Sequence, residues 1–286
     1  MKKLLILSGK GGTGKTTTTA AFIDFSKADA FADCDVDAPN LHLIAGMKGS
    51  PQKTHYYGSE KAIIDDKKCV DCGVCNQNCR FQGIIRADGR YSVNPYACEG
   101  CGVCMYTCPV GAVTMEEDIA GELALYWEER LFSTAKLKMG RGNSGKLVTA
   151  VKKQLEQGHD NEELAIIDGS PGIGCPVIAS ISGVDMVLIV AEPSLSGISD
   201  MKRILRTAEI FQVRMAVCVN KYDTCIENTE EIKRLCQREG IPFVGCIPYD
   251  EKVSIAVNEG HSISKINCPA RDALYQVYEN IKVYFI

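Results

Sequence analysis

Eight of the fifteen cysteines in this 286-residue chain stand in two short runs with the same spacing. The first run, "CVDCGVCNQNC", covers residues 69–79, and the second, "CEGCGVCMYTC", covers residues 98–108. Thiolates at such close spacing bind soft metal ions or metal–sulfur clusters. The odd number of cysteines and their clustering disfavour a disulfide framework. Both features predict metal or redox chemistry in a reducing compartment.

The spacing within each run favours an iron–sulfur cluster over zinc. Two residues separate the first three cysteines and three precede the fourth, so tight turns direct successive thiolates toward one cubane. The pattern resembles bacterial two-cluster ferredoxins, and the "CPVGAVTM" after the second run adds to the likeness. Zinc is the main alternative, because paired C-x2-C motifs also form structural zinc sites. Arg80 stands where those ferredoxins usually have proline, a departure expected to affect the turn and potential of one cluster.

The resemblance to two-cluster ferredoxins implies that the fourth cysteine of each run binds the cluster of the other run. The first expected [4Fe-4S] ligand set is Cys69, Cys72, Cys75 and Cys108. The second expected set is Cys79, Cys98, Cys101 and Cys104.

A separate motif near the N-terminus predicts phosphate binding. "GKGGTGKT", residues 9–16, fits G-x-x-x-x-G-K-[ST] between an expected strand and an expected helix. Backbone N–H groups of the loop and the helix N-terminus would surround phosphate oxygens. Lys15 is expected on the β- and γ-phosphates and Thr16 on Mg²⁺. The predicted nucleotide-binding residues here are Gly9, Lys10, Gly11, Gly12, Thr13, Gly14, Lys15, Thr16 and Thr17.

Lys10, which the basic motif does not require, makes the loop resemble that of the deviant-Walker ATPases, which include MinD, ParA and the nitrogenase iron protein. The resemblance implies that ATP joins two subunits face to face, with Lys10 reaching the partner's nucleotide. It also implies that Asp35 positions the attacking water and that Asp168 holds Mg²⁺ through water. Asn220 and Pro248 fall where the family contacts adenine.

From this resemblance, the predicted catalytic residues are Lys10, Lys15, Asp35 and Asp168. The predicted Mg²⁺ residues are Thr16, Asp35 and Asp168. Asp33 and Asp37 flank Asp35, and the sequence does not separate their roles.

Strand and helix patterns alternate around these residues and are expected to position them. Apolar strands are expected at residues 2–8 and 30–33, and again in "LAIIDGSPG", "DMVLIVAEP", "VRMAVCVNK" and "PFVGCIP". Helices are expected near residues 200–211, 226–239 and 270–281. Continuous apolar strands alternating with helices are typical of a buried parallel sheet. The predicted fold is α/β, a mostly parallel sheet with helices on both faces, of the P-loop NTPase type.

The cysteine block interrupts this alternation, because the sheet needs strands from both sides of it. We therefore predict a discontinuous ATPase domain of residues 1–64 and 116–286. Residues 65–115 are predicted to form an inserted, ferredoxin-like α+β domain. After the block, "GELALYWEERLFSTAKLK" alternates like a hairpin and "GKLVTAVKKQLEQ" has helical spacing.

Composition excludes several classes of partner. The net charge is −4 and the basic residues are scattered, which gives no nucleic-acid or anionic-membrane surface. No segment approaches the ~20 apolar residues of a membrane span. The final "ENIKVYFI" has no basic amphipathic character, so no stable membrane association is expected. A cytoplasmic location is the expectation.

The two chemistries together resemble MinD-superfamily ATPases with an inserted ferredoxin domain. We expect a protein that binds and hydrolyses ATP and couples the nucleotide state of a dimer to electron transfer through two clusters. The dimer would be a homodimer or a heterodimer with a related ATPase, and the redox or acceptor partner is not readable from the chain. An assembly or maturation factor for iron–sulfur or metal centres and a redox-sensing regulatory switch are the alternatives.

Cys175 lies seven residues after Asp168. In the nitrogenase iron protein, which this chain resembles more distantly, a cysteine at that offset helps to hold a cluster between subunits. The companion cysteine, expected near "KLKMGRG", is absent. A small loop thiol and a redox role at a dimer interface are both left open. The remaining cysteines form no C-x2-C pair, which disfavours a cluster-assembly scaffold.

Overall fold

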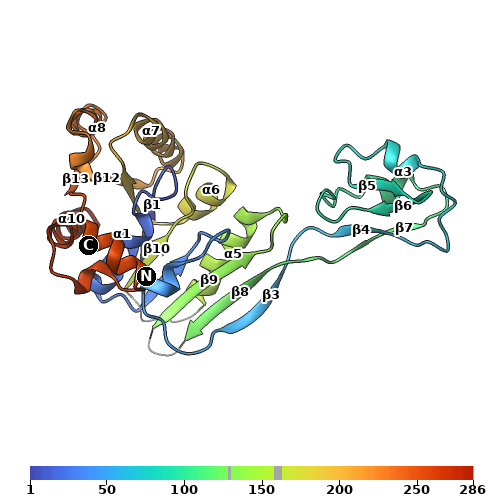
Figure 1. Cartoon of the computed structure of the whole chain (residues 1–286), viewed down its shortest axis with the longest axis horizontal. Coiled ribbons are helices and arrows are strands. Elements are labelled where there is room, and N and C mark those ends of the chain that lie inside the picture. The colour runs from blue at the N-terminus through green and yellow to red at the C-terminus, as the bar shows by residue number, and fades with distance from the viewer. Residues whose placement is uncertain (128–129, 158–162, 286) are drawn as a thin grey trace. The chain divides into compact units, whose positions relative to one another are not determined.

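The computed structural model describes residues 1–127, 130–157 and 163–285. They form two compact units. The first comprises Met1–Lys53, Leu123–Lys136 and Gly145–Ile286, and the second comprises Thr54–Glu122 and Leu137–Ser144 (Figure 1). No helix of the described ranges is long and apolar enough to cross a membrane.

A nine-stranded sheet has the order β13-β12-β11-β1-β10-β2-β9-β8-β3. The pairs from β13 to β9 are parallel, which confirms the predicted mostly parallel sheet. The strands are β1 (Lys2–Leu7), β2 (Ala30–Asp33), β3 (Gln52–Tyr57), β8 (Ile119–Trp127), β9 (Leu131–Leu137), β10 (Leu164–Asp168), β11 (Met186–Ala191), β12 (Arg214–Asn220) and β13 (Phe243–Ile247).

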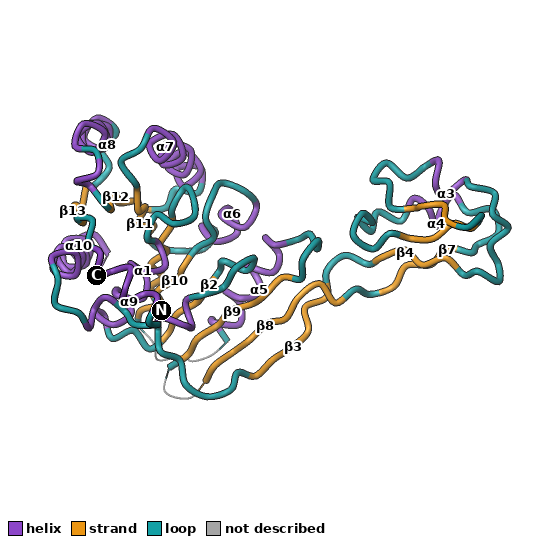
Figure 2. Tube along the Cα trace, in the orientation of Figure 1, coloured by secondary structure: helices purple, strands orange, loops and turns teal. Residues whose placement is uncertain are grey.

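Helices of the first unit lie on both sides of this sheet. Figure 2 shows α7 and α8 on one side of β11 and β12, with α1, α9 and α10 on the other. The helices are α1 (Lys15–Ser26), α2 (Leu41–Ile44), α5 (Ser144–Glu156), α6 (Cys175–Ile181), α7 (Leu195–Ile210), α8 (Ile226–Arg238), α9 (Glu251–Asn258) and α10 (Pro269–Phe285). All six residues of β11 are buried, as a strand covered on both faces requires.

Two details differ from the expected elements. Helix α7 begins at Leu195, five residues before the expected start, because the Ser194 hydroxyl caps it by accepting from Gly197 N. Strands β8 and β9 are sheet neighbours, as a hairpin requires, but residues 128–129 of its turn lie outside the described residues.

The second unit contains both cysteine runs and only short elements. Strand β4 (Lys61–Ile64) pairs with β7 (Val113–Glu116), and β5 (Ile84–Ala87) pairs with β6 (Arg90–Val93), both antiparallel. One-turn helices α3 (Val74–Gln77) and α4 (Val103–Thr107) carry the third cysteine of each run. The unit is wider than the predicted insertion of 65–115, and the predicted domain boundaries themselves stay a prediction.

Candidate functional site

The glycine loop between β1 and α1 has a backbone that side chains would not tolerate. Gly12 and Gly14 adopt left-handed φ angles of +79° and +96°. A Cβ on Gly14 would lie 2.3 Å from Asn220 Nδ2, and one on Gly9 would lie 2.2 Å from Asp200 Cβ. Residues at the end of β12 and on α7 therefore pack against the loop so closely that these positions require glycine.

The end of β10 meets the start of α1 through Asp168. Lys15 Nζ lies 2.8 Å from Asp168 Oδ1, and both side chains are buried. The Thr16 hydroxyl donates to Asp168 Oδ2 at 2.8 Å, and the Thr19 hydroxyl donates to Oδ1 at 2.9 Å. Burial alone lowers the pKa of Lys15, but attraction by Asp168 and two further aspartates outweighs burial, so the pKa is raised. The structure thus brings together the predicted phosphate lysine and two predicted Mg²⁺ residues.

Asp33 at the end of β2 shapes the loop that carries Asp35. Its Oδ1 accepts from Asp35 N at 2.9 Å, and its Oδ2 accepts from Asn40 N and Leu41 N at 2.9 and 3.0 Å. Burial and the nearby Asp168 raise the pKa of Asp33. The backbone N–H groups that donate to its carboxylate lower the pKa, but by less. Asp33 is therefore a structural carboxyl group, a role that the sequence did not separate.

Asp35 is half-buried, whereas Asp37 is exposed. Burial raises the pKa of Asp35, and Lys15 opposes this shift. A direct link joins the two loops that carry the predicted switch aspartates, because Cys34 N donates to Asp168 O at 2.8 Å and the Ser170 hydroxyl donates to Cys34 O.

Lys10 is held by residues of its own chain. Its Nζ lies 2.8 Å from Glu192 Oε2, just after β11, and donates to the Ser194 hydroxyl at 3.4 Å. Neither partner was expected from the sequence. The pair is partly exposed, with 37% of the Lys10 side chain accessible, so the lysine can exchange Glu192 for another anion.

Asn220 braces the glycine loop. Its Nδ2 donates to Thr13 O at 2.8 Å, and the neighbouring Lys221 Nζ donates to Gly12 O at 3.3 Å. Asn220 also borders a cavity of about 230 Å³ between the loop and α9. Among the described residues, Pro248 does not line this cavity. The predicted adenine contacts stay predictions.

The eight clustered cysteines surround two separate small cavities in the second unit. The cysteines at the first cavity are Cys69, Cys72, Cys75 and Cys108. The cysteines at the second cavity are Cys79, Cys98, Cys101 and Cys104. Each set therefore takes three thiols from one run and the fourth from the other.

Backbone N–H groups point at the fourth cysteine of each run. Gly83 N donates to Cys79 Sγ at 3.2 Å, and Ala112 N donates to Cys108 Sγ at 3.2 Å. Burial raises the pKa of Cys108, but the backbone N–H groups of residues 110–113 together outweigh burial and the pKa is lowered. Within the described ranges, no group of three or more His, Cys, Asp or Glu side chains is placed to hold a metal ion.

Cys175 is exposed at the first position of α6. The other end of α6 is held by the buried Lys152 of α5, whose Nζ donates to Ala179 O at 3.0 Å and Ser180 O at 2.9 Å. Burial lowers the pKa of Lys152. Lys152 thus stabilises the helix that follows the Asp168 loop.

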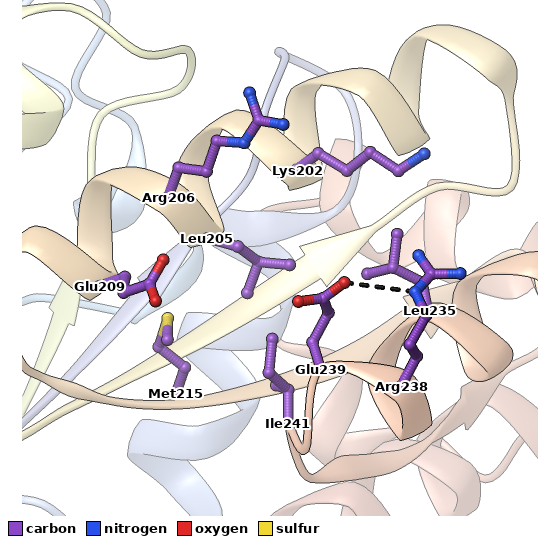
Figure 3. A pocket seen from close by; sticks show the side chains of 9 residues that line it. All are labelled: Lys202, Leu205, Arg206, Glu209, Met215, Leu235, Arg238, Glu239 and Ile241. Carbon is purple, nitrogen blue, oxygen red and sulfur yellow. Dashed lines mark hydrogen bonds and ion pairs between the residues drawn. The ribbon is translucent and has the colours of Figure 1, made fainter.

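A groove of about 380 Å³ between α7 and α8 contains none of the predicted site residues. Figure 3 shows Lys202, Arg206 and Glu209 on α7 and Met215 below Glu209. Arg238 and Glu239, which also line the groove, form an ion pair at 3.3 Å. Charges of both signs line this groove, and we assign it no function.

Comparisons with known proteins point to a family of nucleotide binding domains. The family model for the CobQ/CobB/MinD/ParA nucleotide binding domain matches residues 4–263. The chain is 31% identical to uncharacterized protein MJ0578 of Methanocaldococcus jannaschii, covering 99% of this chain and 97% of that protein. It is 23% identical to septum site-determining protein MinD of Bacillus subtilis, covering 91% and 81%.

Solved structures share the fold at low sequence identity. The cell division ATPase MinD of Pyrococcus furiosus has a TM-score of 0.58 and 17% identity, covering 99% of both chains. MinD of Pyrococcus horikoshii OT3, complexed with Mg-ADP, has a TM-score of 0.58 and 15% identity, covering 98% of this chain and 95% of that chain.

Proposed function

We propose, since the chain belongs to the CobQ/CobB/MinD/ParA nucleotide binding family, that it is an ATP-hydrolysing iron–sulfur protein of a reducing, cytoplasmic compartment. In this proposal, the nucleotide state of a dimer controls electron transfer through two [4Fe-4S] clusters to a separate redox protein. The observation that carries the proposal is the partition of eight cysteines into two crossed sets of four, each around its own cavity.

The spacing of the cysteines favours iron–sulfur clusters over single zinc ions in this proposal. A zinc ion needs its sulfurs about 2.3 Å from one point, and the described cysteines do not converge in that way. A cubane is larger, and each of its four irons takes one cysteine, so its ligands stand further apart. Each cluster, when bound, supplies a one-electron carrier. Apolar neighbours such as Val113 and Ile84 pack against the cysteines and would exclude water.

The contacts of Asp168 support the proposed ATP and Mg²⁺ site. Lys15 and Thr16 already converge on this carboxylate. We propose that Lys15 exchanges Asp168 for a phosphate oxygen, while Thr16 and Asp168 hold Mg²⁺ and Asp35 orients the attacking water. Catalysis then rests on positioning and on neutralising charge around the transferred phosphoryl group.

Lys10 connects the proposed site to a second subunit. Its ion pair with Glu192 keeps the ammonium beside the loop of its own protomer. We propose that this pair breaks when a partner's nucleotide offers a more concentrated negative charge. The partner is a second copy of this chain or a related ATPase.

The test is an anaerobic electron-transfer assay. The purified protein should contain about eight irons per chain, four for each cubane. After chemical reduction, it should deliver electrons to a one-electron acceptor faster with Mg-ATP than with ADP or a non-hydrolysable ATP analogue. Zinc in place of iron, or a rate that ignores the nucleotide, would overturn the proposal.

A further inference from the structure

The two cysteine runs share their cysteine spacing but differ in charge at both positions between their first two cysteines, and at the first of these Val70 corresponds to Glu99. Asp71, between the first two cysteines of its run, corresponds to Gly100 in the second run. Both residues are left-handed, with φ of 52° and 69°. Glycine adopts this conformation freely, whereas a non-glycine residue there is uncommon. The first run therefore carries a carboxylate at a position where its backbone would favour glycine.

Asp71 places negative charge beside the first set. Its Oδ1 lies 3.7 Å from Cys69 Sγ, which as a thiol donates to it. As a cluster ligand, Cys69 would be a thiolate, and the carboxylate would repel additional negative charge there. In the part of the chain that the structure describes, no cation within ion-pair distance of Asp71 offsets this charge.

The second set has the opposite kind of neighbour. The half-buried Lys61 Nζ donates to the backbone carbonyl oxygen of its ligand Cys98. A carboxylate cannot be introduced at Gly100 without rearrangement, because a Cβ there would lie 2.2 Å from Glu60 O. The exposed Glu99 also borders this cavity and offsets part of the Lys61 charge.

Backbone hydrogen bonds do not explain a difference between the sets. Hydrogen bonds to sulfur raise the potential of a cluster, and among the described residues one backbone N–H at the same distance donates to the fourth cysteine of each run, although further N–H groups of residues 110–113 lie near Cys108. Gly83 N lies 3.2 Å from Cys79 Sγ, and Ala112 N lies 3.2 Å from Cys108 Sγ. The clearest difference between the two sets is therefore the charged side chains beside them, Asp71 at the first set and Lys61 at the second.

We infer that Asp71 and Lys61 give the two cysteine sets unequal reduction potentials, the set that includes Cys69 having the lower one and the set that includes Cys98 the higher. Reduction adds negative charge, so a nearby carboxylate opposes it and a nearby ammonium favours it. When a low-potential donor gives up one electron, the donor is oxidised and the cluster at the second set is reduced. No bond forms or breaks in this step. This inference rests on the proposed function and adds a direction to it, from the first set toward the second.

The experiment is anaerobic protein-film voltammetry of the full chain, after its iron and sulfide have been measured. The wild-type protein should show two one-electron waves. Asp71→Asn and Asp71→Gly should each move the lower wave to higher potential and leave the upper wave in place. Lys61→Met should move the upper wave to lower potential. Glycine adopts the left-handed conformation of position 71 without strain. A shift that is seen in both variants therefore cannot come from misfolding of Asp71→Asn.

Asp88→Asn is the matched control, because Asp88 is exposed, left-handed at φ 51° and borders neither cysteine cavity. It should leave both waves unchanged. Coincident waves, or an upper wave that responds to Asp71, would overturn the inference while leaving the proposed function standing. Protein that contains no iron and sulfide would overturn both.

Discussion

The phosphate region and the cysteine unit hold their functional groups in different ways. Thr16 and Asp168 are 152 residues apart in sequence, and the buried pairing of β1 with β10 brings them together. The cysteine unit has only short elements, and three of the six buried residues in its core are cysteines. A small core of this kind gains much of its stability from bound metal. The phosphate region should therefore fold without the clusters, and the cysteine unit should not.

The largest expected effect is on ATP hydrolysis. Lys15→Ala removes the buried ammonium that faces Asp168, so turnover should fall by at least about 100-fold, as when a preorganised charge is removed from a transition state. Iron content should not change, because the phosphate region does not supply cluster ligands. Phosphate release and iron analysis measure the two outcomes.

Lys153→Ala on α5 is the control for this substitution, because Lys153 is exposed and should tolerate the change. Turnover retained in Lys15→Ala would show that the phosphate site is assigned wrongly. Loss of iron in the same variant would contradict the separation of the two regions.

The next effect concerns the cysteine unit alone. Removing iron with a chelator under reducing conditions should leave residues 54–122 open to proteolysis, because the cysteines then lose the bonds that join the two runs. The rest of the chain should resist the protease and keep its nucleotide affinity. Limited proteolysis with peptide mapping, before and after chelation, measures this. Cleavage spread evenly over both units would mean that they share their stability.

Local patterns predicted the parts of each region that depend on nearby residues. The glycine loop and the buried strands are readable because glycine spacing and continuous apolar runs are properties of short segments. The crossed cysteine sets followed from spacing together with resemblance, and the structure gathers the same two sets. No sequence pattern, however, indicates that position 71 has room for a side chain whereas position 100 does not.

Contacts between distant segments were not readable. Glu192 is an ordinary residue after a strand until the fold places it at Lys10. Thr19 was missed because its hydroxyl acts on Asp168 only once α1 packs on β10. The same holds for Lys152, whose burial depends on α6. Such roles arise from tertiary packing, which a single sequence does not encode in any local period.

A smaller effect is expected on the pH dependence of folding. Burial and Asp168 raise the pKa of Asp33, so the folded state binds its proton more tightly than the unfolded state. The resulting stabilisation is complete below the unfolded pKa of about 4 and is lost as pH rises through the raised value. In Asp33→Asn, the free energy of unfolding should therefore fall less over this pH range, by roughly 1 kcal/mol or more.

Urea unfolding followed by circular dichroism, from about pH 5 to about pH 7.5, measures this slope. Asp37→Asn is the matched control, because Asp37 is exposed on the same loop. An unchanged slope in Asp33→Asn, with a constant offset, would show that this carboxyl group is ionised throughout the range.

The last prediction concerns the reactivity of the individual thiols. Burial raises the pKa of Cys34 to about 12, whereas Cys175 is exposed. Alkylating reagents attack the thiolate, so Cys34 should react roughly 10³-fold more slowly than an ordinary thiol. Mass mapping should find Cys175 modified in the iron-loaded protein, the eight clustered cysteines only after iron removal, and Cys34 in neither. Cys175→Ser should abolish the rapid labelling. Fast modification of Cys34 after iron removal would mean that loss of the clusters opens the sheet itself, and the two regions would then be one cooperative structure.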